Sequence, residues 1–523
     1  MVKQLKINQS IPILTALLGM LLAVVYHYIA RVAGTPLMLN LDDGYIHARI
    51  AEVFADSGRI GINPMEGGGG SSSTLWTLLL TIEKLLGIHG ELGAFFSSLF
   101  SWGFAVWAVS RLAFQVTTKL RALLIALLIA GTGQLAALAL SGMETHLVLA
   151  CLAMSLEARS KQGAKRAILW ASLASLVRPE AALLAIAYTL NVLLIKDTKL
   201  KNKIRNGLNI LIIPLLSAFF GLLFLTVFSG SFPSMIAGRR WLIELPQFPW
   251  NDLILSCQAA LQLILQLDER MADYIGPAYG FGFLWMMIVR TLALIGMINW
   301  WKDGKTKREM LFFLILHSLF YLILLPTPGH LGRYFNPVWV LTGLLVVSGW
   351  EEVANYFNQQ RIWNRIRPYL AVALILGMLP QIVRWGAWNR QAMEHLRQVH
   401  FLMAKTISEM KSDEGKFAAF DIGILSYFGC QRLVDLGGLT DSEMAQALHQ
   451  GTVPSLLEKR RVSYIILPEV SGNLRYIFAR KLGLDIAGLQ EIARFSFKVK
   501  NNRYLHATNV AFPALGLYKW NHE

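Results

Sequence analysis

Long apolar runs alternate with short polar or basic segments along most of the chain. Several of these runs approach the roughly 20 residues that a helix needs to cross a bilayer. The first covers residues 9–33 and the last covers residues 368–386. A soluble core does not need so many runs of this length. The pattern therefore predicts a mainly α, polytopic membrane helix bundle of about 10–12 membrane helices, some of them short or re-entrant.

Clusters of lysine and arginine between the runs predict the orientation, because loops rich in these residues stay on the cytoplasmic side. The clusters lie at residues 111–121, 159–166, 196–205, 302–308 and 361–367, and Lys3 and Lys6 precede the first run. The amino terminus is then cytoplasmic. The segments expected on the outer face are residues 34–73, 141–145, 178–180, 231–276 and 326–334.

Three segments do not fit a simple series of crossings. Residues 74–110 contain two apolar runs where the orientation allows one crossing, so either the first run lies along the outer interface or one basic loop is not cytoplasmic. Residues 167–195 are short for two crossings at about 1.5 Å per residue, which places Arg178-Pro179-Glu180 at the tip of a partly inserted hairpin. Residues 231–276 are too long for a plain turn and are expected to form a lid or a lateral wall.

The composition changes near residue 390. Short strand-like runs appear at residues 417–420, 433–436 and 462–467, and helical patterns such as residues 395–410 separate them. Alternation of strands and helices predicts an α/β domain. We therefore expect a transmembrane catalytic domain at residues 1–389, with residues 34–73 as its first outer loop, and a C-terminal extracytoplasmic α/β domain at residues 390–523.

Composition supports this class. Hydrophobic residues make up 54% of the 523 residues and charged residues 16%, against about 25% charged in a soluble protein. The net charge of +16 would suggest a nucleic-acid partner in a soluble protein. Here the basic residues cluster between apolar runs, so we expect no nucleic acid.

The three cysteines show no metal spacing. The first run is longer than a signal peptide requires, which indicates a retained helix.

The adjacent carboxylates Asp42 and Asp43 follow the first run, where an unexplained charge is costly. Neighbouring side chains point about 100° apart on a helix, so the pair cannot hold one atom symmetrically. We expect one to act as a general base and the other to orient a partner, a metal or the loop. Asp43 is also a plausible N-cap, which makes Asp42 the slight favourite as the base. The pair is also compatible with a divalent cation, although nothing else in the sequence requires one.

Basic side chains in the outer segments are candidates for binding a donor phosphate, because a guanidinium group contacts two phosphate oxygens at once. They are Arg178, Arg239, Arg240, His330 and Arg333. Each has a simpler interpretation as an anchor to lipid head groups. That alternative is strongest for Arg239 and Arg240, whereas Arg333, at a helix start, is the favoured phosphate ligand.

Other outer residues are candidates for contacts with the substrate. They are Tyr45, His47, Asn63, Glu66, Ser72, Ser73, Trp76, Glu144, Glu180 and Tyr334. Glu144 and Glu180 lie at membrane depth, where charges are usually paired or functional. Glu180 has an obvious partner in Arg178, and Glu144 has none. The glycine and serine tract at residues 67–73 is either a flexible connector or a source of N–H and hydroxyl groups for a sugar or phosphate.

These residue types favour sugar transfer from a lipid phosphate to a hydroxyl. The acceptor needs a general base, and the phosphate leaving group needs positive charge beside it. Two spaced carboxylates would instead suit hydrolysis of a glycosidic bond.

Several of these stretches resemble motifs of GT-C-type membrane glycosyltransferases, the arabinofuranosyltransferase-like and related enzymes that use polyprenyl-phosphate sugars. The likeness rests on Asp42-Asp43-Gly44-Tyr45-Ile46, Asn63-Pro64 and residues 71–79, and then on residues 141–145, 178–180, 332–334, 421–423 and 434–441. The resemblance implies an inverting transfer with Asp42 or Asp43 as the base. Gly44 stands where Ala is more usual and His146 where Pro is common, which leaves the sugar undecided.

The sequence thus predicts a multi-pass glycosyltransferase of the bacterial cytoplasmic membrane, with its active site on the periplasmic face. Its partners would be the bilayer, a polyprenyl-phosphate sugar as donor, and a glycan, glycolipid or protein acceptor. Two alternatives remain: a polysaccharide polymerase or ligase of another membrane fold, and a transporter or flippase of lipid-linked sugars. A transporter would favour related halves and charges within the membrane, and the sequence shows no strong repeat.

Overall fold

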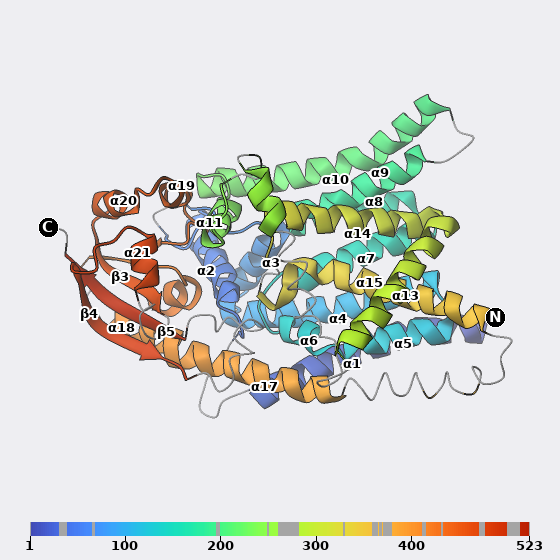
Figure 1. Ribbon diagram of the computed structural model, residues 1–523, viewed down its shortest axis with the longest axis horizontal. Helices are drawn as coiled ribbons and strands as arrows, with labels where there is room; N and C mark the ends of the chain where they lie inside the picture. Colours follow the sequence, from blue (N-terminus) through green and yellow to red (C-terminus); the bar gives the residue numbers. More distant parts are fainter. Residues whose placement is uncertain are drawn as a thin grey trace.

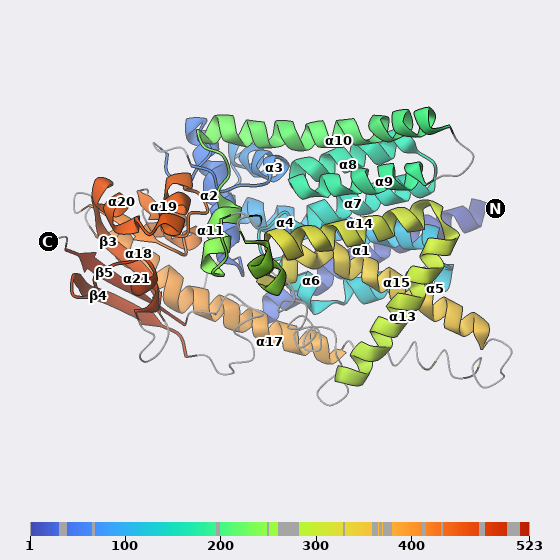
Figure 2. The ribbon, with the colours of Figure 1, turned by 45° about the horizontal axis from the view of Figure 1, so that its top comes forward.

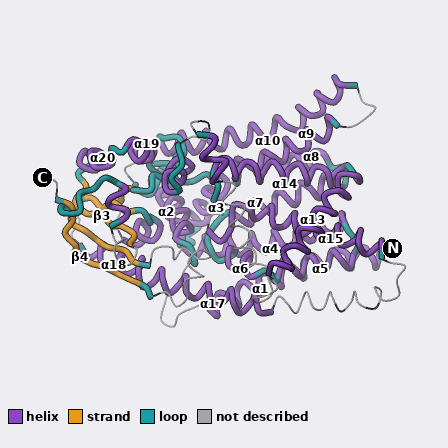
Figure 3. Tube along the Cα trace, viewed as in Figure 1, coloured by secondary structure: helices purple, strands orange, loops and turns teal. Residues whose placement is uncertain are grey.

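The computed structural model describes residues 2–30, 39–64, 68–194, 199–247, 250, 252–259, 282–327, 330–357, 365, 369, 379–410, 415–429, 432–469, 476–498 and 513–521. Its helices form an elongated bundle with the amino terminus at one end (Figure 1). All described strands lie at the other end, in the C-terminal part of the chain (Figure 3). The predicted membrane helix bundle with a C-terminal α/β domain is confirmed.

Long and short helices are combined in the bundle. Among the described residues, three helices are long and apolar enough to cross a membrane: α1 (Val2–Ala30), α4 (Gly90–Val116) and α10 (Leu200–Ser229). Four neighbours are shorter: α5 (Lys119–Ala130), α7 (Thr145–Ser160), α8 (Ala164–Val177) and α9 (Leu183–Leu193). With 11 to 16 residues each, these helices are about 17–24 Å long, less than the roughly 30 Å of the hydrocarbon core.

Short connections join these helices. Turns of a few residues join α4 to α5 and α7 to α8 at the end that carries the amino terminus. At the other end, the 3₁₀ helix η1 (Pro179–Ala182) links α8 to α9. Residues 167–195 thus form the expected short hairpin, with Arg178 at its tip. The helix α3 (Thr74–Leu85) has 12 residues and is too short to cross at about 1.5 Å per residue, whereas α4 is long enough to cross.

The remaining helices of the bundle lie on one side of this hairpin (Figure 2). They are α6 (Gly133–Leu138), α13 (Gly282–Asp303), α14 (Lys305–Leu324) and α15 (Asn336–Tyr356), with the 3₁₀ helix η3 (His330–Phe335) before α15. The segment 231–276 contains α11 (Met235–Leu242). Residues 260–276 and most of the last expected membrane helix lie outside the described residues, so the proposed lid remains a prediction.

The C-terminal part is built on a five-stranded mixed sheet in the order β2-β1-β3-β5-β4. The strands are β1 (Lys416–Ala419), β2 (Leu433–Asp435), β3 (Val462–Glu469), β4 (Leu489–Ser496) and β5 (Ala514–Trp520). β1 pairs in parallel with β2 and β3, and β5 pairs antiparallel with β3 and β4. The first three strands were predicted from the sequence, and β4 and β5 were not.

Alternate residues of the sheet face two different cores, as the two-residue period of a strand requires. Phe417 and Ala419 belong to the hydrophobic core that is continuous with the membrane bundle, and Ala418 belongs to a second core. Helices of that second core are α19 (Ser442–Gln450), α20 (Val453–Lys459) and α21 (Ile477–Lys481). The sheet therefore packs against the bundle on one face and its own helices on the other.

A continuous helical segment leads from the bundle into this domain. It consists of α17 (Leu379–His395), the π-helical turn η4 (Leu396–Phe401) and α18 (Leu402–Glu409). The boundary proposed near residue 390 therefore falls inside a helix. Between the bundle and the sheet lies α2 (Asp42–Ser57), part of the proposed first outer loop (Figure 1). Tyr45 of α2 packs its ring against Tyr427 and Phe428 of η6 (Leu425–Gly429), at 5.7 and 5.6 Å between centroids.

Candidate active site

The first turn of α2 carries both candidate aspartates. The helix begins at Asp42, and its N-cap is Leu41, whose extended backbone offers no capping side chain. Asp43 is therefore not the N-cap. Carboxylates in a first turn interact favourably with the partial positive charge of the helix N-terminus, so the position itself tolerates two acidic residues.

Glycines let this turn approach the loop before α7. A Cβ at Gly44 would lie 2.0 Å from the Ser141 carbonyl oxygen, and Gly142 has a φ of +73°. The contact brings Glu144 to α2, where its Oε2 lies 3.4 Å from His47 Nε2. Glycine at position 44 is thus explained by close backbone packing.

Asp43 points to two arginines from distant parts of the chain. Its Oδ2 accepts hydrogen bonds from Arg239 Nη2 of α11 at 3.0 Å and from Arg333 Nη2 of η3 at 2.6 Å. Arg333 is only 3% exposed. Its Nε and Nη1 atoms, and Nε of Arg239, are buried without a hydrogen-bond partner in the described part of the chain. Buried donors that lack acceptors are costly, typically about 1–3 kcal/mol each, which indicates a ligand that supplies acceptors.

Three guanidinium groups surround the ring of Tyr334. The distances from Cζ to the ring centroid are 5.3 Å for Arg178, 5.8 Å for Arg239 and 5.2 Å for Arg333. Such contacts stabilise a cation over an aromatic face. Tyr321 of α14 stacks on the same ring, with centroids 5.0 Å apart. Tyr334 therefore holds the arginines close together despite their mutual repulsion.

Arg178 connects this cluster to two glutamates. Its Nε lies 2.7 Å from Glu180 Oε1, and its Nη1 lies 3.4 Å from Glu144 Oε1. Glu180 also accepts a hydrogen bond from the Tyr321 hydroxyl group. The pairing of Glu180 with Arg178 follows the simple sequence interpretation. The partners of Glu144 are not adjacent in sequence, and the structure shows them to be His47 and Arg178.

Asp42 has a different environment from Asp43. Its Oδ2 accepts from the backbone N–H of Gly423, and its Oδ1 from that of Ile424, each at 2.8 Å. A Cβ at Gly423 would lie 2.0 Å from the Asp42 carbonyl oxygen. Asp42 thus fastens α2 to the C-terminal domain. The two aspartates point to different partners, as expected of neighbours on a helix.

Replacing Gly423 by alanine is expected to loosen this contact. The added methyl group would force the backbones apart, which typically costs about 1–3 kcal/mol. Hydrogen–deuterium exchange of the peptide that contains Ile424 should become faster. Gly343→Ala is the matched control, because no atom lies within 4 Å of a Cβ at that glycine. Unchanged protection in Gly423→Ala would contradict the assignment.

Other predicted site residues have structural roles. Arg240 donates to the carbonyl oxygens of Pro246, Ile323 and Leu324 and to Ser256 Oγ, at 2.6 to 3.2 Å. It therefore caps the end of α14 and does not join the arginine cluster. The Trp76 indole donates to the Gly142 carbonyl oxygen at 3.1 Å. Ser73 caps α3 by accepting from the backbone N–H of Trp76.

Tyr45 and Ser72 have contacts away from the arginine cluster. The Tyr45 hydroxyl group accepts from the backbone N–H of Leu39 and donates to Glu91, each at 3.0 Å. Ser72 is half-buried beside the cap of α3. Glu66 and the side chain of His330 lie outside the described residues.

The glycine-rich tract is a packing surface. A Cβ at Gly68 would lie 2.6 Å from the Thr440 carbonyl oxygen, and one at Gly70, with φ +130°, would lie 2.4 Å from Thr440 Cγ2. The backbone N–H of Gly69 donates to Ser231 Oγ at 3.2 Å. The described residues of this tract therefore let the first outer segment pack tightly against the C-terminal domain.

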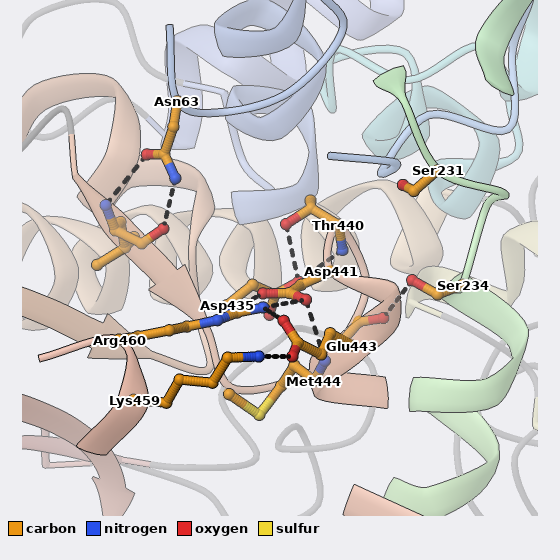
Figure 4. Close-up of polar contacts among 12 residues, drawn as sticks. Asn63, Ser231, Ser234, Asp435, Thr440, Asp441, Glu443, Met444, Lys459 and Arg460 are labelled. Carbon is orange, nitrogen blue, oxygen red and sulfur yellow. Dashed lines mark hydrogen bonds and ion pairs between the residues drawn. The ribbon is translucent and has the colours of Figure 1, made fainter. Parts of the chain in front are cut away.

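A cavity of about 300 Å³ lies at this junction. Figure 4 shows Asn63 on one side, where its amide donates to the Leu433 carbonyl oxygen at 3.0 Å and accepts from the Leu433 N–H at 3.1 Å. On the other side, Arg460 pairs with Asp441 and Glu443. Beside them, the carboxylate of Asp435 accepts from the N–H groups of Gly437 and Thr440. The cavity is thus lined by hydrogen-bonding groups from both parts of the chain.

The stability contributed by Asp42, Asp435 and His400 is expected to fall as the pH rises from 5 to 8. Burial raises the pKa of Asp42 and of Asp435 to about 6. Burial disfavours charge on His400, but the hydrogen bond from its ring to Asp421 and the charges of Asp421 and Asp42 outweigh this and raise the pKa of His400. The folded state therefore holds protons that the unfolded state releases, and the stabilisation is lost as the pH rises through these pKa values.

Thermal unfolding followed by tryptophan fluorescence would test this. The comparison is with Asp435→Asn, which cannot titrate at this position. The wild-type midpoint, measured relative to that of Asp435→Asn, should be higher at pH 5.5 than at pH 8. A relative midpoint that increases with pH would contradict the prediction.

The donor atoms of the site do not fit a divalent cation. No group of three potential metal ligands from His, Cys, Asp and Glu occurs among the described residues. The Asp43 carboxylate is held by two arginines, and Glu144 lies against Arg178 and His47. A cation beside Asp43 would face two guanidinium groups within about 4 Å, which is strongly unfavourable. The arrangement instead suits an anion.

Comparisons with known proteins agree with the observed fold. A family profile described as a domain of unknown function (DUF8728) matches residues 386–512. A search of curated proteins finds no match. ArnT from Cupriavidus metallidurans in the apo state is similar, with a TM-score of 0.54, 12% identity and 95% of each chain covered. ArnT bound to undecaprenyl phosphate gives a TM-score of 0.52, 12% identity and 97% of each chain covered.

The oligosaccharyltransferase AglB from Archaeoglobus fulgidus, in complex with an inhibitory peptide and a dolichol-phosphate, is also similar. Its TM-score is 0.51 at 12% identity, with 88% of this chain and 69% of that chain covered. Identities this low show the fold alone. The chain has the fold of the GT-C membrane glycosyltransferases.

Proposed function

We propose that the protein is an inverting glycosyltransferase that moves a sugar from a polyprenyl-phosphate donor to an acceptor hydroxyl. The reaction would take place at the outer face of the bacterial cytoplasmic membrane. The observation that carries the proposal is the buried guanidinium group of Arg333, which contacts Asp43 through Nη2 and leaves Nε and Nη1 without an acceptor in the described part of the chain. A carboxylate and unused cationic donors then lie side by side, as transfer from a phosphate requires.

The donor phosphate is proposed to bind in the arginine cluster. Arg333 and Arg239 have N–H groups without acceptors among the described residues, and a guanidinium group can bind two phosphate oxygens. The position of Arg178 also suits a lipid donor. It lies at the tip of the hairpin of α8 and α9, whose helices are only about 17–21 Å long, so a phosphate there would remain attached to a chain in the bilayer.

Asp43 is the better candidate for the general base. Asp42 is held by two backbone N–H groups of the C-terminal domain, whereas Asp43 touches the arginines that would hold the donor. The sequence slightly favoured Asp42, and the geometry reverses that preference. In the proposed reaction, the acceptor oxygen bonds to the anomeric carbon, its proton passes to Asp43, and the bond from that carbon to the phosphate oxygen breaks.

Donor binding would also activate the base. The two arginines stabilise the Asp43 carboxylate and so weaken its affinity for a proton. A phosphate that binds these arginines competes with Asp43 for them. Asp43 would then become a stronger base only when the donor is present.

The junction cavity is the proposed place of acceptor contact. It combines Asn63 of the first outer segment with the polar groups of the C-terminal domain. The segment at Gly438 also contacts α11, where Ser234 Oγ donates to the Gly438 carbonyl oxygen at 2.8 Å. Since Arg239 lies on α11, an acceptor in this cavity would be linked to the arginine cluster through one short helix.

The structural neighbours are consistent with such a donor. ArnT has been solved with undecaprenyl phosphate and AglB with dolichol-phosphate, and both ligands are polyprenyl phosphates. AglB has also been solved with a tethered acceptor peptide. These ligands support the proposal for this chain without fixing the sugar or the acceptor.

Transfer by the purified protein tests the proposal. The full chain in lipid would be incubated with radiolabelled polyprenyl-phosphate sugars and a crude cell-envelope acceptor. We expect the label to move from one of the donors to the acceptor, with release of polyprenyl phosphate. No transfer from any donor would contradict the proposal. Movement of intact donor across vesicles would favour the flippase, and transfer of a whole oligosaccharide would favour the polymerase or ligase.

A further inference from the structure

A second cavity lies at the end of the bundle that carries the amino terminus. Its volume is about 770 Å³, and it lies between the last turns of α4 and α7 and the first turns of α8. The sequence places this end in the cytoplasmic half of the membrane, because the basic clusters gather there. The cavity is separated from the arginine cluster by the length of α7, whose 16 residues span about 24 Å. It is therefore distinct from the proposed donor site.

One wall of this cavity is strongly basic. Its charged residues are Arg111, Glu157, Lys161, Lys165 and Arg166. Glu157, the one acidic residue among them, is 4% exposed and pairs with Arg111 at 2.8 Å and with Lys161. No described residue forms an ion pair with Lys165 or Arg166, and both are exposed. The wall thus has an excess of three positive charges, two of them available to a ligand.

Apolar side chains also line the cavity. They are Met154, Ala158, Leu169 and Trp170. Leu169 and Trp170 lie one turn after Lys165 and Arg166, on the same faces of α8. Leu169 is 56% exposed, which suits contact with lipid chains better than contact with water. A ligand that matches both sets of side chains carries a negative head group and hydrocarbon chains.

A formed turn contributes to the lining of the cavity. Gln162 adopts a φ of +60°, and the backbone N–H of Gly163 donates to the Ala158 carbonyl oxygen at 2.9 Å. This turn directs the chain into the first turn of α8, where Lys165 and Arg166 follow. The N–H groups at that helix start add partial positive charge. The basic wall therefore belongs to a shaped site and not only to a charged surface.

We propose that this cavity binds the head group of an anionic phospholipid from the cytoplasmic leaflet. Basic cavities between membrane helices on this side are suited to such head groups. The phosphate would contact Lys165 and Arg166, and the acyl chains would lie along Leu169 and Trp170. Since α7 and α8 also carry Glu144 and Arg178 at their outer ends, a bound lipid would stabilise the two helices that support the proposed active site. The site does not depend on the proposed transferase activity.

Native mass spectrometry of the full-length protein tests the proposal. Detergent-purified protein would be titrated with phosphatidylglycerol and, separately, with phosphatidylcholine of the same chain length. We expect a clear preference for phosphatidylglycerol and about a tenfold or greater loss of its affinity in K165Q/R166Q. The matched control is K201Q/R205Q, which removes the same charge from exposed residues of α10 near the same end of the bundle.

Three outcomes would overturn the site. One is equal binding of the two lipids. Another is an equal loss of affinity in K165Q/R166Q and K201Q/R205Q, which would indicate general surface attraction. The third is displacement of phosphatidylglycerol by inorganic phosphate at millimolar concentration, which would indicate a free phosphate site. Retained preference in K201Q/R205Q together with its loss in K165Q/R166Q supports the proposal.

Discussion

Replacing Arg333 by lysine is expected to reduce sugar transfer by about 10²- to 10³-fold, as observed when one preorganised donor of a charge-stabilising site is lost. Lysine retains the positive charge but replaces the planar guanidinium group by a single ammonium. It can pair with Asp43 or with the phosphate, but it cannot reproduce Nη2 on the carboxylate together with Nε and Nη1 on the donor. The loss should appear in the rate at saturating donor as well as in donor affinity.

A matched substitution separates this effect from general damage. Arg390→Lys makes the same change at an exposed ion pair with Glu394, outside the site. It should transfer sugar at the wild-type rate, and both variants should keep the wild-type unfolding midpoint. Activity of Arg333→Lys within about twofold of wild type would contradict the phosphate assignment, since even a modest loss of one such contact exceeds that.

Asp43→Asn is expected to lower transfer by about 10²- to 10⁴-fold, the usual contribution of a general base. Asparagine cannot accept the proton of the acceptor hydroxyl. Its residual activity should no longer depend on pH over the range where the wild-type carboxylate titrates. The fold should persist, because Arg239 and Arg333 keep their contacts with Tyr334.

Asp42→Asn should behave differently. One of its two acceptor oxygens becomes an amide N–H₂ that faces a backbone N–H of the C-terminal domain. We expect a lower unfolding midpoint and faster exchange at Ile424, while the remaining activity keeps the pH dependence of wild type. If Asp42→Asn is inactive but stable, and Asp43→Asn is active, Asp42 is the base and our assignment fails.

The sequence predicted the outer segments of the site because they carry charge in an apolar chain. Asp43, Arg178, Arg239, Arg333 and Tyr334 all come together from segments that the basic loops place on one face. The sequence could not distinguish the roles of Arg239 and Arg240, because these neighbours differ only in the direction in which α11 points their side chains. Arg239 reaches Asp43, and Arg240 caps α14.

Tyr321 was missed for a related reason. It lies in the apolar run of α14, where nothing distinguishes it from residues that face lipid, yet it stacks on Tyr334 and donates to Glu180. The role of Asp42 was also hidden, because its partners are backbone N–H groups, which any residue can supply. Contacts made through the backbone of a distant segment do not depend on residue type, so the local sequence pattern cannot predict them.

The C-terminal sheet shows the same limit. The first three strands are short apolar runs, and the sequence identified them. The edge strand β4 contains polar residues such as Gln490, Glu491 and Arg494, so its sequence is typical of an exposed segment. It becomes a strand by pairing with β5, a partner that lies further along the chain. Pairing of this kind depends on tertiary structure rather than on the composition of the strand itself.

The two aspartates occupy successive positions in one helical turn, one bound to the C-terminal domain and the other to the arginines. This arrangement limits how the chain can be divided or recombined. A chimera that exchanges the C-terminal domain with that of a relative would also have to exchange the start of α2 and the segment around Gly423. The C-terminal domain is therefore not a removable accessory, because it binds the same helix turn that carries the proposed base.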